Sequence, residues 1–272
     1  MNCSLGIITS HMSEDFLKRR ERVSVATHWG EAVVYRGVLE GVDTAVVLRY
    51  GDEATTASHR VNYRANIWAM KRLGVGRIVA QNAIGSLNPD IVPGDYVIPH
   101  DFMDFTKNRP LSFFQEEDCW SRVDMSSPFC EELRRKLIAA AGENGVSARE
   151  SGIFVCTEGP RFETPAEVRY YRSTGGDIIG TPMVPEVVLA REAGICYASL
   201  SMVINMATGL APAIDHSGEQ GIITYYRRTG MEQTVEAILR SLAKRLPEER
   251  ECVCAQAPEK GMHGKMPPWY EA

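Results

Sequence analysis

Two carboxylates and an aromatic ring stand close together in the segment Val155 to Glu167. The apolar run Gly152 to Cys156 predicts a buried strand, and Glu158, Phe162 and Glu163 follow its end. Because ligands of open α/β sheets bind outside the carboxyl ends of strands, this position suits a binding site. An aromatic face beside a carboxylate suits a flat heterocycle that forms hydrogen bonds, such as a purine base. A structural alternative stays open, in which Phe162 is core and Glu163 caps the next helix.

Four segments of the chain resemble motifs of one family in the same order. The segment Glu158-Gly-Pro-Arg-Phe-Glu163 resembles a motif of the purine nucleoside phosphorylases, in the branch with methylthioadenosine phosphorylases. Residues 61–70, 82–87 and 180–199 are similar to further family motifs, and the resemblance runs from about Leu5 to about Leu246. It implies a pentosyltransferase that releases a purine base and a ribose-1-phosphate-type sugar. It also implies inorganic phosphate as co-substrate, no cofactor or metal, and a homotrimer.

The resemblance assigns the base end of the site. Glu163 and Asn205 are the expected catalytic pair, and Phe162, Ala83 and Ile84 complete the base pocket. Glu163 falls where 6-oxopurine enzymes use a carboxylate that accepts from N1–H. Methylthioadenosine-specific members tend to have a small hydroxyl residue there and an Asp in place of Asn205. A neutral amide can donate to a 6-oxo group, so the pair favours hypoxanthine or guanine. In the alternative reading, Asn205 only satisfies backbone groups at a strand end.

The sugar end indicates a 5′-modified nucleoside. Ile222 and Ile223 fall where methylthionucleoside enzymes carry apolar residues, and Thr181 and Met183 are expected beside them. A thioether prefers that surface, whereas His216 could instead meet a 5′-hydroxyl. The two isoleucines could also be helix-packing residues. The candidate substrates are therefore methylthioadenosine, methylthioinosine, and inosine or guanosine.

The phosphate end departs from the family pattern. The usual glycine-rich turn reads Thr9-Ser10-His11-Met12, and Arg-His-Gly becomes Arg49-Tyr50-Gly51. Pro182 and Met183 replace a Ser or Thr, and proline offers neither a hydroxyl nor an N–H. Each lost donor to a charged group costs about 1.5–3 kcal/mol. Two alternatives to phosphorolysis therefore stay open: a phosphate-independent nucleoside hydrolase, and a repurposed protein that binds a planar aromatic ligand. The predicted phosphate contacts are Ser10, His11, Arg49, Tyr50, Asn82 and Ala83.

The elements that must position these residues alternate along the chain. Strands are expected at 4–9, 77–83, 95–99, 152–156, 177–179 and 196–204, with a hairpin over 31–39 and 43–49. Helices are expected at 59–73, 128–141, from 165, at 184–193 and at 231–245. The pattern predicts an α/β domain over 1–246 with a mixed central sheet, and a C-terminal tail over 247–272 that wraps the surface or is partly disordered. The resemblance adds partial barrel character. It also implies that Phe102 to Phe114 helps to close a neighbouring subunit's site, the alternative being a loop folded on its own domain.

Composition limits the class of protein. The 272 residues are 44% hydrophobic and 24% charged, with a net charge of -5, which fits a soluble globular domain. No basic stripe suggests nucleic-acid binding, and no apolar run suggests a membrane span or secretory signal, so we expect a cytoplasmic protein. The seven cysteines include Cys130, Cys156 and Cys196 in apolar patterns, expected to be reduced core residues. Cys252-Val-Cys254 alone is a weak metal or redox pattern, so no metal site is predicted.

Overall fold

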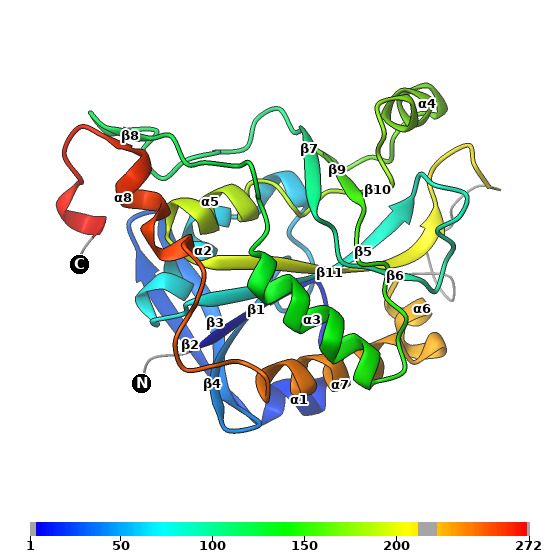
Figure 1. Cartoon of the computed structure of the whole chain (residues 1–272), viewed down its shortest axis with the longest axis horizontal. Helices are drawn as coiled ribbons and strands as arrows, with labels where there is room; N and C mark the ends of the chain where they lie inside the picture. Colours follow the sequence, from blue (N-terminus) through cyan, green and yellow to red (C-terminus); the bar gives the residue numbers. More distant parts are fainter. Residues whose placement is uncertain (1–3, 212–221, 271–272) are drawn as a thin grey trace.

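The chain folds around one large mixed β-sheet, as the computed structural model in Figure 1 shows for residues 4–211 and 222–270. The strands follow the order β2-β3-β4-β1-β5-β10-β9-β7, and β11 also pairs with β5 and β6. The sequence therefore predicted the α/β class and the mixed sheet correctly. Within the part of the chain that the structure describes, no helix is both long enough and apolar enough to cross a membrane.

The sheet strands are β1 (Leu5–Thr9), β2 (Glu21–Thr27), β3 (Gly30–Leu39), β4 (Val42–Leu48), β5 (Arg77–Ser86), β6 (Tyr96–Val97), β7 (Asp101–Phe105), β9 (Ile153–Thr157), β10 (Ile178–Gly180) and β11 (Cys196–Met206). A separate small pair joins β8 (Trp120–Ser121) to β12 (Met262–His263). The helices are α1 (Glu14–Lys18), α2 (Tyr63–Arg72), α3 (Glu131–Glu143), α4 (Pro165–Ser173), α5 (Glu186–Glu192), α6 (Ile222–Thr229), α7 (Met231–Ala243) and α8 (Ala257–Gly261).

Strand β5 is the centre of the sheet. It pairs in parallel with β1 and β11, and its last residues pair antiparallel with β10. Because β5 has three neighbours, the sheet branches at its carboxyl end rather than continuing flat. This branching gathers the carboxyl ends of β1, β5 and β11 beside β9 and β10.

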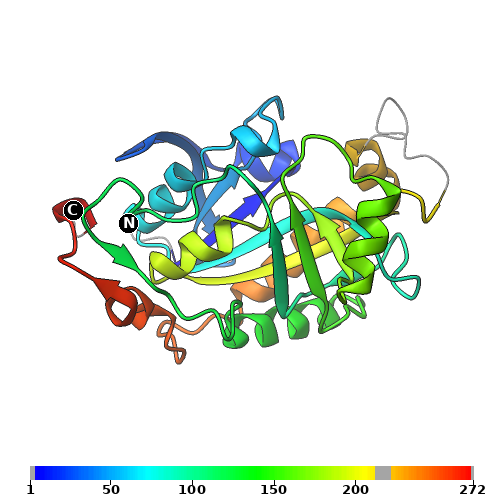
Figure 2. The ribbon, with the colours of Figure 1, turned by 90° about the horizontal axis from the view of Figure 1, so that it is seen from above.

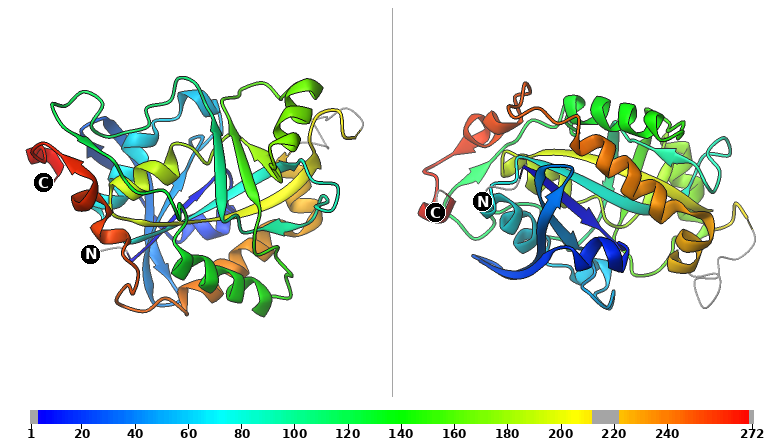
Figure 3. Two further views of the ribbon diagram at one scale, coloured as in Figure 1. Left: turned by 45° about the horizontal axis from the view of Figure 1, so that its top comes forward. Right: turned by 90° about the horizontal axis from the view of Figure 1, so that it is seen from below.

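Alternate residues of the central strands pack on opposite faces of the sheet. Ile7 and Val46 belong to one apolar cluster, whereas Ile8 and Val47 belong to the other. This is the two-residue period of a strand that is buried on both faces. Helices α3 and α7 lie side by side across one face, as the right panel of Figure 3 shows, and α2 and α5 cover the other.

The boundaries differ from the predicted ones in a few places. Helix α3 begins at Glu131, and Cys130 precedes it without a side-chain cap, so the predicted start at Pro128 was wrong. The sequence analysis missed β2, an exposed edge strand whose side chains are only half-buried on alternate positions. A strand with one solvated face and a short apolar pattern gives a weak sequence signal.

The C-terminal segment folds back onto the domain. Figure 2 shows it running from α7 to the end of the sheet where β11 begins. Trp269 and Tyr270 pack on Trp68, and the Tyr270 hydroxyl donates to the Glu192 carbonyl oxygen at 2.6 Å. The described part of the tail, to residue 270, is therefore a packed layer of the domain.

The stretch from Phe102 to Phe114 packs largely on its own chain. Phe113 and Phe114 are buried in the core, and Phe113 contacts Trp68. Phe105 stands earlier in the stretch, at the end of the edge strand β7, and packs against Tyr171. The reading of this stretch as a loop folded on its own domain therefore holds for its second half.

Candidate active site

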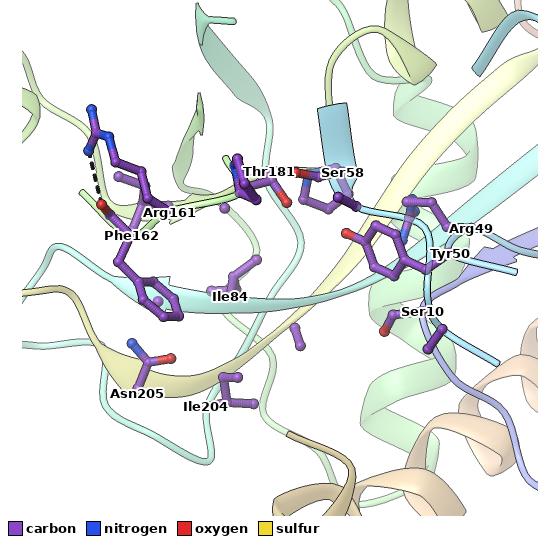
Figure 4. Close-up of a pocket in the computed structure, with 18 of the residues that line it drawn as sticks. Ser10, Arg49, Tyr50, Ser58, Ile84, Arg161, Phe162, Thr181, Ile204 and Asn205 are labelled. Atoms are coloured by element: carbon purple, nitrogen blue, oxygen red, sulfur yellow. Dashed lines mark hydrogen bonds between the residues drawn. The ribbon is translucent and has the colours of Figure 1, made fainter. Parts of the chain in front are cut away.

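A pocket of about 700 Å³ opens where the carboxyl ends of the strands converge. A volume of this size accommodates a small organic ligand. Of the predicted site residues, ten line it: Ser10, His11, Arg49, Tyr50, Ala83, Ile84, Phe162, Glu163, Thr181 and Asn205. Figure 4 shows Phe162 and Asn205 at one end, Ser10, Arg49 and Tyr50 at the other, and Ile84 and Ile204 between them.

The base end is built by the turn after β9. Phe162 is 50% exposed and lines the pocket, so it is not a core residue. Helix α4 is capped by Thr164, which forms a capping box with Glu167. Glu163 is thus free of any capping role, and its Oε1 accepts a hydrogen bond of 2.6 Å from the Thr157 hydroxyl. The structural alternative for this motif was therefore wrong.

A bulge in β11 sets the position of Asn205. The register of β11 against β5 shifts between Val203 and Asn205, which re-aims the side chains that follow. The Asn205 amide Nδ2 donates to the Met206 carbonyl oxygen at 2.8 Å. A Cβ on Gly85 would lie 3.2 Å from that Nδ2, so a side chain at position 85 would press on the Asn205 amide. One of the two amide N–H groups is used by the backbone, and the second can serve a ligand.

Glu158, the other carboxylate of the motif, is turned away from the pocket. Its Oε2 accepts from the backbone N–H of Lys107 at 2.6 Å, and its Oε1 lies 3.8 Å from Arg109 Nε. Arg109 is buried and also donates to the carbonyl oxygens of Thr157 and Val184. These contacts fix the loop after β7 against the turn after β9.

Arg49 lies at the end of the pocket where phosphate is expected to bind, which we call the anion end. A buried carboxylate holds it in place. Its Nε and Nη2 lie 2.5 and 3.1 Å from the two carboxylate oxygens of Glu186, and both residues are almost fully buried. The Tyr197 hydroxyl donates to the same Glu186 at 2.8 Å. Burial alone would lower the pKa of Arg49, but the attraction of Glu186 outweighs it and raises the pKa. A phosphate group would therefore share Arg49 with a carboxylate.

Two other basic side chains among the described residues of the pocket also lie near carboxylates. His11 Nε2 lies 3.2 Å from Glu232 Oε1, and Arg161 forms two hydrogen bonds to Glu167. The Ser10 Oγ is buried and lacks a hydrogen-bond partner among residues 4–211 and 222–270, and His11 Nε2, although close to Glu232, forms no hydrogen bond with those residues either. A buried hydroxyl without a partner is costly, which marks Ser10 as a group that a ligand can satisfy.

Two of the predicted site residues lie outside the pocket wall, and two more cannot be assessed. Asn82 is fully buried and donates to the Ser199 hydroxyl at 2.8 Å, because it pairs with Ser201 and therefore shares the face of the sheet on which Ser199 lies. Met183 is also fully buried in the core, and only the neighbouring Pro182 lines the pocket. Ile222 and Ile223 open helix α6, but their side chains lie outside the described residues, as does His216.

Sequence reasoning missed several polar residues of the pocket. Thr56, Ser58, Thr208 and Thr224 line it, and none of them was predicted. The run of Thr and Ser after Arg49 was the available signal, since it follows a strand that ends at the same edge as Thr9. A Cβ on Gly159, whose φ is +67°, would lie 2.5 Å from the Ser58 hydroxyl, so this glycine is required by both conformation and space.

Titratable groups also gather away from the pocket. Cys130, Cys196, Cys252 and Cys254 place their sulfur atoms within 4.8 Å of one another at the start of β11. Cys130 and Cys196 are buried as predicted. Their proximity to the Cys-x-Cys pair is a feature that the sequence pattern alone did not reveal.

The amino-acid sequence matches the model of the phosphorylase superfamily over residues 7–248. A probable 6-oxopurine nucleoside phosphorylase of Dictyoglomus turgidum is 42% identical over 89% of this chain and 90% of its own. A probable S-methyl-5'-thioinosine phosphorylase of Methanopyrus kandleri is 46% identical over 78% of this chain and 80% of its own. The crystal structure of a methylthioadenosine phosphorylase sourced from an antarctic soil metagenomic library superimposes with a TM-score of 0.87 at 29% identity, covering 96% of this chain and 93% of that one. Since the family model and these relatives span most of the fold and the pocket, this chain belongs to the phosphorylase superfamily.

Proposed function

We propose that this protein is a purine nucleoside phosphorylase that prefers 6-oxopurine bases to adenine. The observation that carries the proposal is the joint presence of Glu163 and Asn205 at the end of the pocket where Phe162 lies. A 6-oxopurine offers an N1–H donor and an O6 acceptor, whereas adenine offers an N1 acceptor and a 6-amino donor. A carboxylate opposite N1 and an amide N–H opposite position 6 match the first pattern and oppose the second.

The orientation of Glu163 strengthens this assignment. Because Thr157 occupies Oε1, the other carboxylate oxygen remains for the base. Oε2 forms no hydrogen bond with the residues that the structure describes. A hydrogen bond to a charged group contributes about 1.5–3 kcal/mol, which corresponds to roughly a 10- to 150-fold preference.

The proposed reaction breaks the N-glycosidic bond. A phosphate oxygen forms a bond to the anomeric carbon, and the base leaves with the electron pair of the C–N bond. The second N–H of the Asn205 amide stabilises the negative charge that develops on the base. At the other end, Ser10 and Thr56 line the pocket with Arg49, and their hydroxyls can donate to a phosphate co-substrate.

The names of the relatives support a 6-oxopurine nucleoside or its 5′-methylthio form as the substrate. Ile84 and Ile204 line the middle of the pocket and offer apolar surface there (Figure 4). We therefore propose inosine, guanosine and methylthioinosine as the substrate set, with methylthioadenosine a weaker substrate.

The anion end leaves two competing functions open, a phosphate-independent hydrolysis and the binding of a planar ligand without reaction. Among the described residues that line the pocket, the basic side chains His11, Arg49 and Arg161 each lie near a carboxylate. Water could then replace phosphate as the attacking group, or the pocket could only bind a planar ligand.

Purine release with and without phosphate separates these functions. Inosine, methylthioinosine and methylthioadenosine are each incubated with the enzyme, and the free base is quantified. We expect release that requires phosphate and is faster for the two 6-oxopurine substrates. Equal release without phosphate would establish a hydrolase, and tight binding without release would establish a binding protein. Faster release from methylthioadenosine would refute the 6-oxopurine assignment.

The family resemblance also supports a cytoplasmic homotrimer. In such a trimer, the first half of the Phe102 to Phe114 stretch would face a neighbouring subunit, because Phe113 and Phe114 are buried in their own core. Light scattering of the full chain tests the assembly, with three times the monomer mass as the expected result.

A further inference from the structure

The four-cysteine cluster unites three distant segments of the chain. Cys130 directly precedes α3, Cys196 is the first residue of β11, and Cys252 and Cys254 belong to the C-terminal segment. Their four sulfur atoms lie within 4.8 Å of one another, with Cys130, Cys196 and Cys254 buried and Cys252 half-buried. Two cysteines from separate segments and one Cys-x-Cys pair can together supply all four ligands of a tetrahedral metal site.

We propose that these four cysteines bind one zinc ion as a structural site. A tetrahedral zinc with bonds of about 2.3 Å to sulfur places its ligand atoms roughly 3.8 Å apart. Cys196 and Cys252 place their sulfurs 3.2 Å apart, and all pairs lie within 4.8 Å. Small rotations of these side chains therefore bring the cluster to the tetrahedral arrangement.

The surrounding charges match a metal thiolate centre. One Zn²⁺ with four thiolates carries two net negative charges. Arg191 Nη1 lies 3.6 Å from Cys254 Sγ, and Arg250 Nη1 lies 3.9 Å from Cys196 Sγ. Two guanidinium groups directed at the sulfurs offset that charge, as second-shell donors do at metal sites. Both guanidinium groups also donate to backbone carbonyl oxygens, Arg250 to those of Gly76 and Gly194 and Arg191 to that of Pro128, so they are fixed beside the sulfurs.

The loop that carries Cys252 and Cys254 is also held in place. Glu132, in the first turn of α3, accepts from the backbone N–H groups of Glu251 and Cys252 at 3.0 and 3.1 Å. The helix that supplies Cys130 therefore also orients the Cys-x-Cys pair. Such support shapes the site before the metal binds.

The site is far from the pocket. Asn205 stands near the other end of the strand that Cys196 begins, about 30 Å away along β11. All four ligand positions are protein thiols, which leaves no open position for a substrate, so the role of the metal is structural. The zinc ion would fix the C-terminal segment, whose later residues Trp269 and Tyr270 pack on Trp68.

The metal content of the full-length protein tests the proposal. Protein purified under reducing conditions with zinc present is dialysed and analysed by mass spectrometry for metals. We expect about one zinc per chain in the wild type. A Cys252→Ser/Cys254→Ser double variant should lose at least nine-tenths of that zinc, whereas Cys119→Ser, a buried cysteine outside the cluster, should retain it.

Cobalt substitution provides a readout that needs no variant to fold. The wild-type apoprotein loaded with Co²⁺ should show the intense visible absorption of a tetrahedral cobalt thiolate, which zinc then abolishes. Wild-type protein that takes up neither metal while its thiols are reduced would overturn the proposal. Disulfides among the four cysteines, found in the non-reduced wild type with no bound zinc, would overturn it equally.

Discussion

The replacement of Glu163 by Gln tests whether this carboxylate accepts a hydrogen bond from N1–H of the base. The Thr157 hydroxyl donates to Glu163 Oε1, and a glutamine keeps this bond only by presenting its amide oxygen to Thr157. Its amide NH₂ then faces the base. The substitution therefore exchanges an acceptor for a donor at the position opposite N1, with almost no change of shape.

The expected effect has opposite signs for the two classes of base. With inosine, the charged hydrogen bond of about 1.5–3 kcal/mol is lost, which lowers kcat/KM by roughly 10- to 150-fold. With adenosine, a neutral hydrogen bond of about 0.5–1.5 kcal/mol is gained at N1, which raises kcat/KM by roughly 2- to 12-fold. The preference between the two nucleosides should therefore shift by roughly 20-fold or more.

Steady-state rates of base release from both nucleosides, at saturating phosphate, measure this shift. Thr157→Val is the matched control, because it removes the hydroxyl that orients position 163 and keeps a similar volume at a buried site. In that background Glu163→Gln can turn its oxygen to the base, so the shift in preference should shrink. An equal loss of kcat/KM with both nucleosides would show that Glu163 does not bind N1 of the base, and it would refute the proposed base recognition.

Three further predictions follow from single contacts. Asn205→Asp should lower kcat/KM for inosine and shift the preference toward 6-amino bases, since a carboxylate cannot donate to O6. An unchanged preference in competition assays would show that Asn205 does not donate to the base. Gly159→Ala should destabilise the fold by about 1–3 kcal/mol in chemical denaturation, because its φ is +67° and the new Cβ would meet the Ser58 hydroxyl at 2.5 Å. Burial raises the pKa of Glu192 from its ordinary 4.5 to about 7. Between these pH values the folded state binds more protons than the unfolded state, so the free energy of unfolding should fall as pH rises from 4.5 to 7. Glu192→Gln can still accept from the Phe113 N–H, and it should flatten that part of the stability profile; a wild-type-like slope would contradict this.

Local sequence patterns predicted most of the sheet and one end of the pocket. The apolar strand before Glu158 and the Pro165 start of α4 depend on neighbouring residues, so periodicity and turn chemistry were sufficient. Phe162 and Glu163 stand in the turn after this predicted strand, and both line the pocket. The exposed strand β2 and the start of α3 were missed or misplaced because their local signals are weak.

The amino-acid sequence by itself determined the order of the elements, the family and the residue types at the base end. Only the tertiary structure decided which partner each of those side chains received. Arg49 meets Glu186 across 137 positions of sequence, and Cys196 meets Cys252 across 56. The physical reason is that periodicity reports which face of an element is buried, whereas the pairing of charges and thiols depends on which buried faces meet.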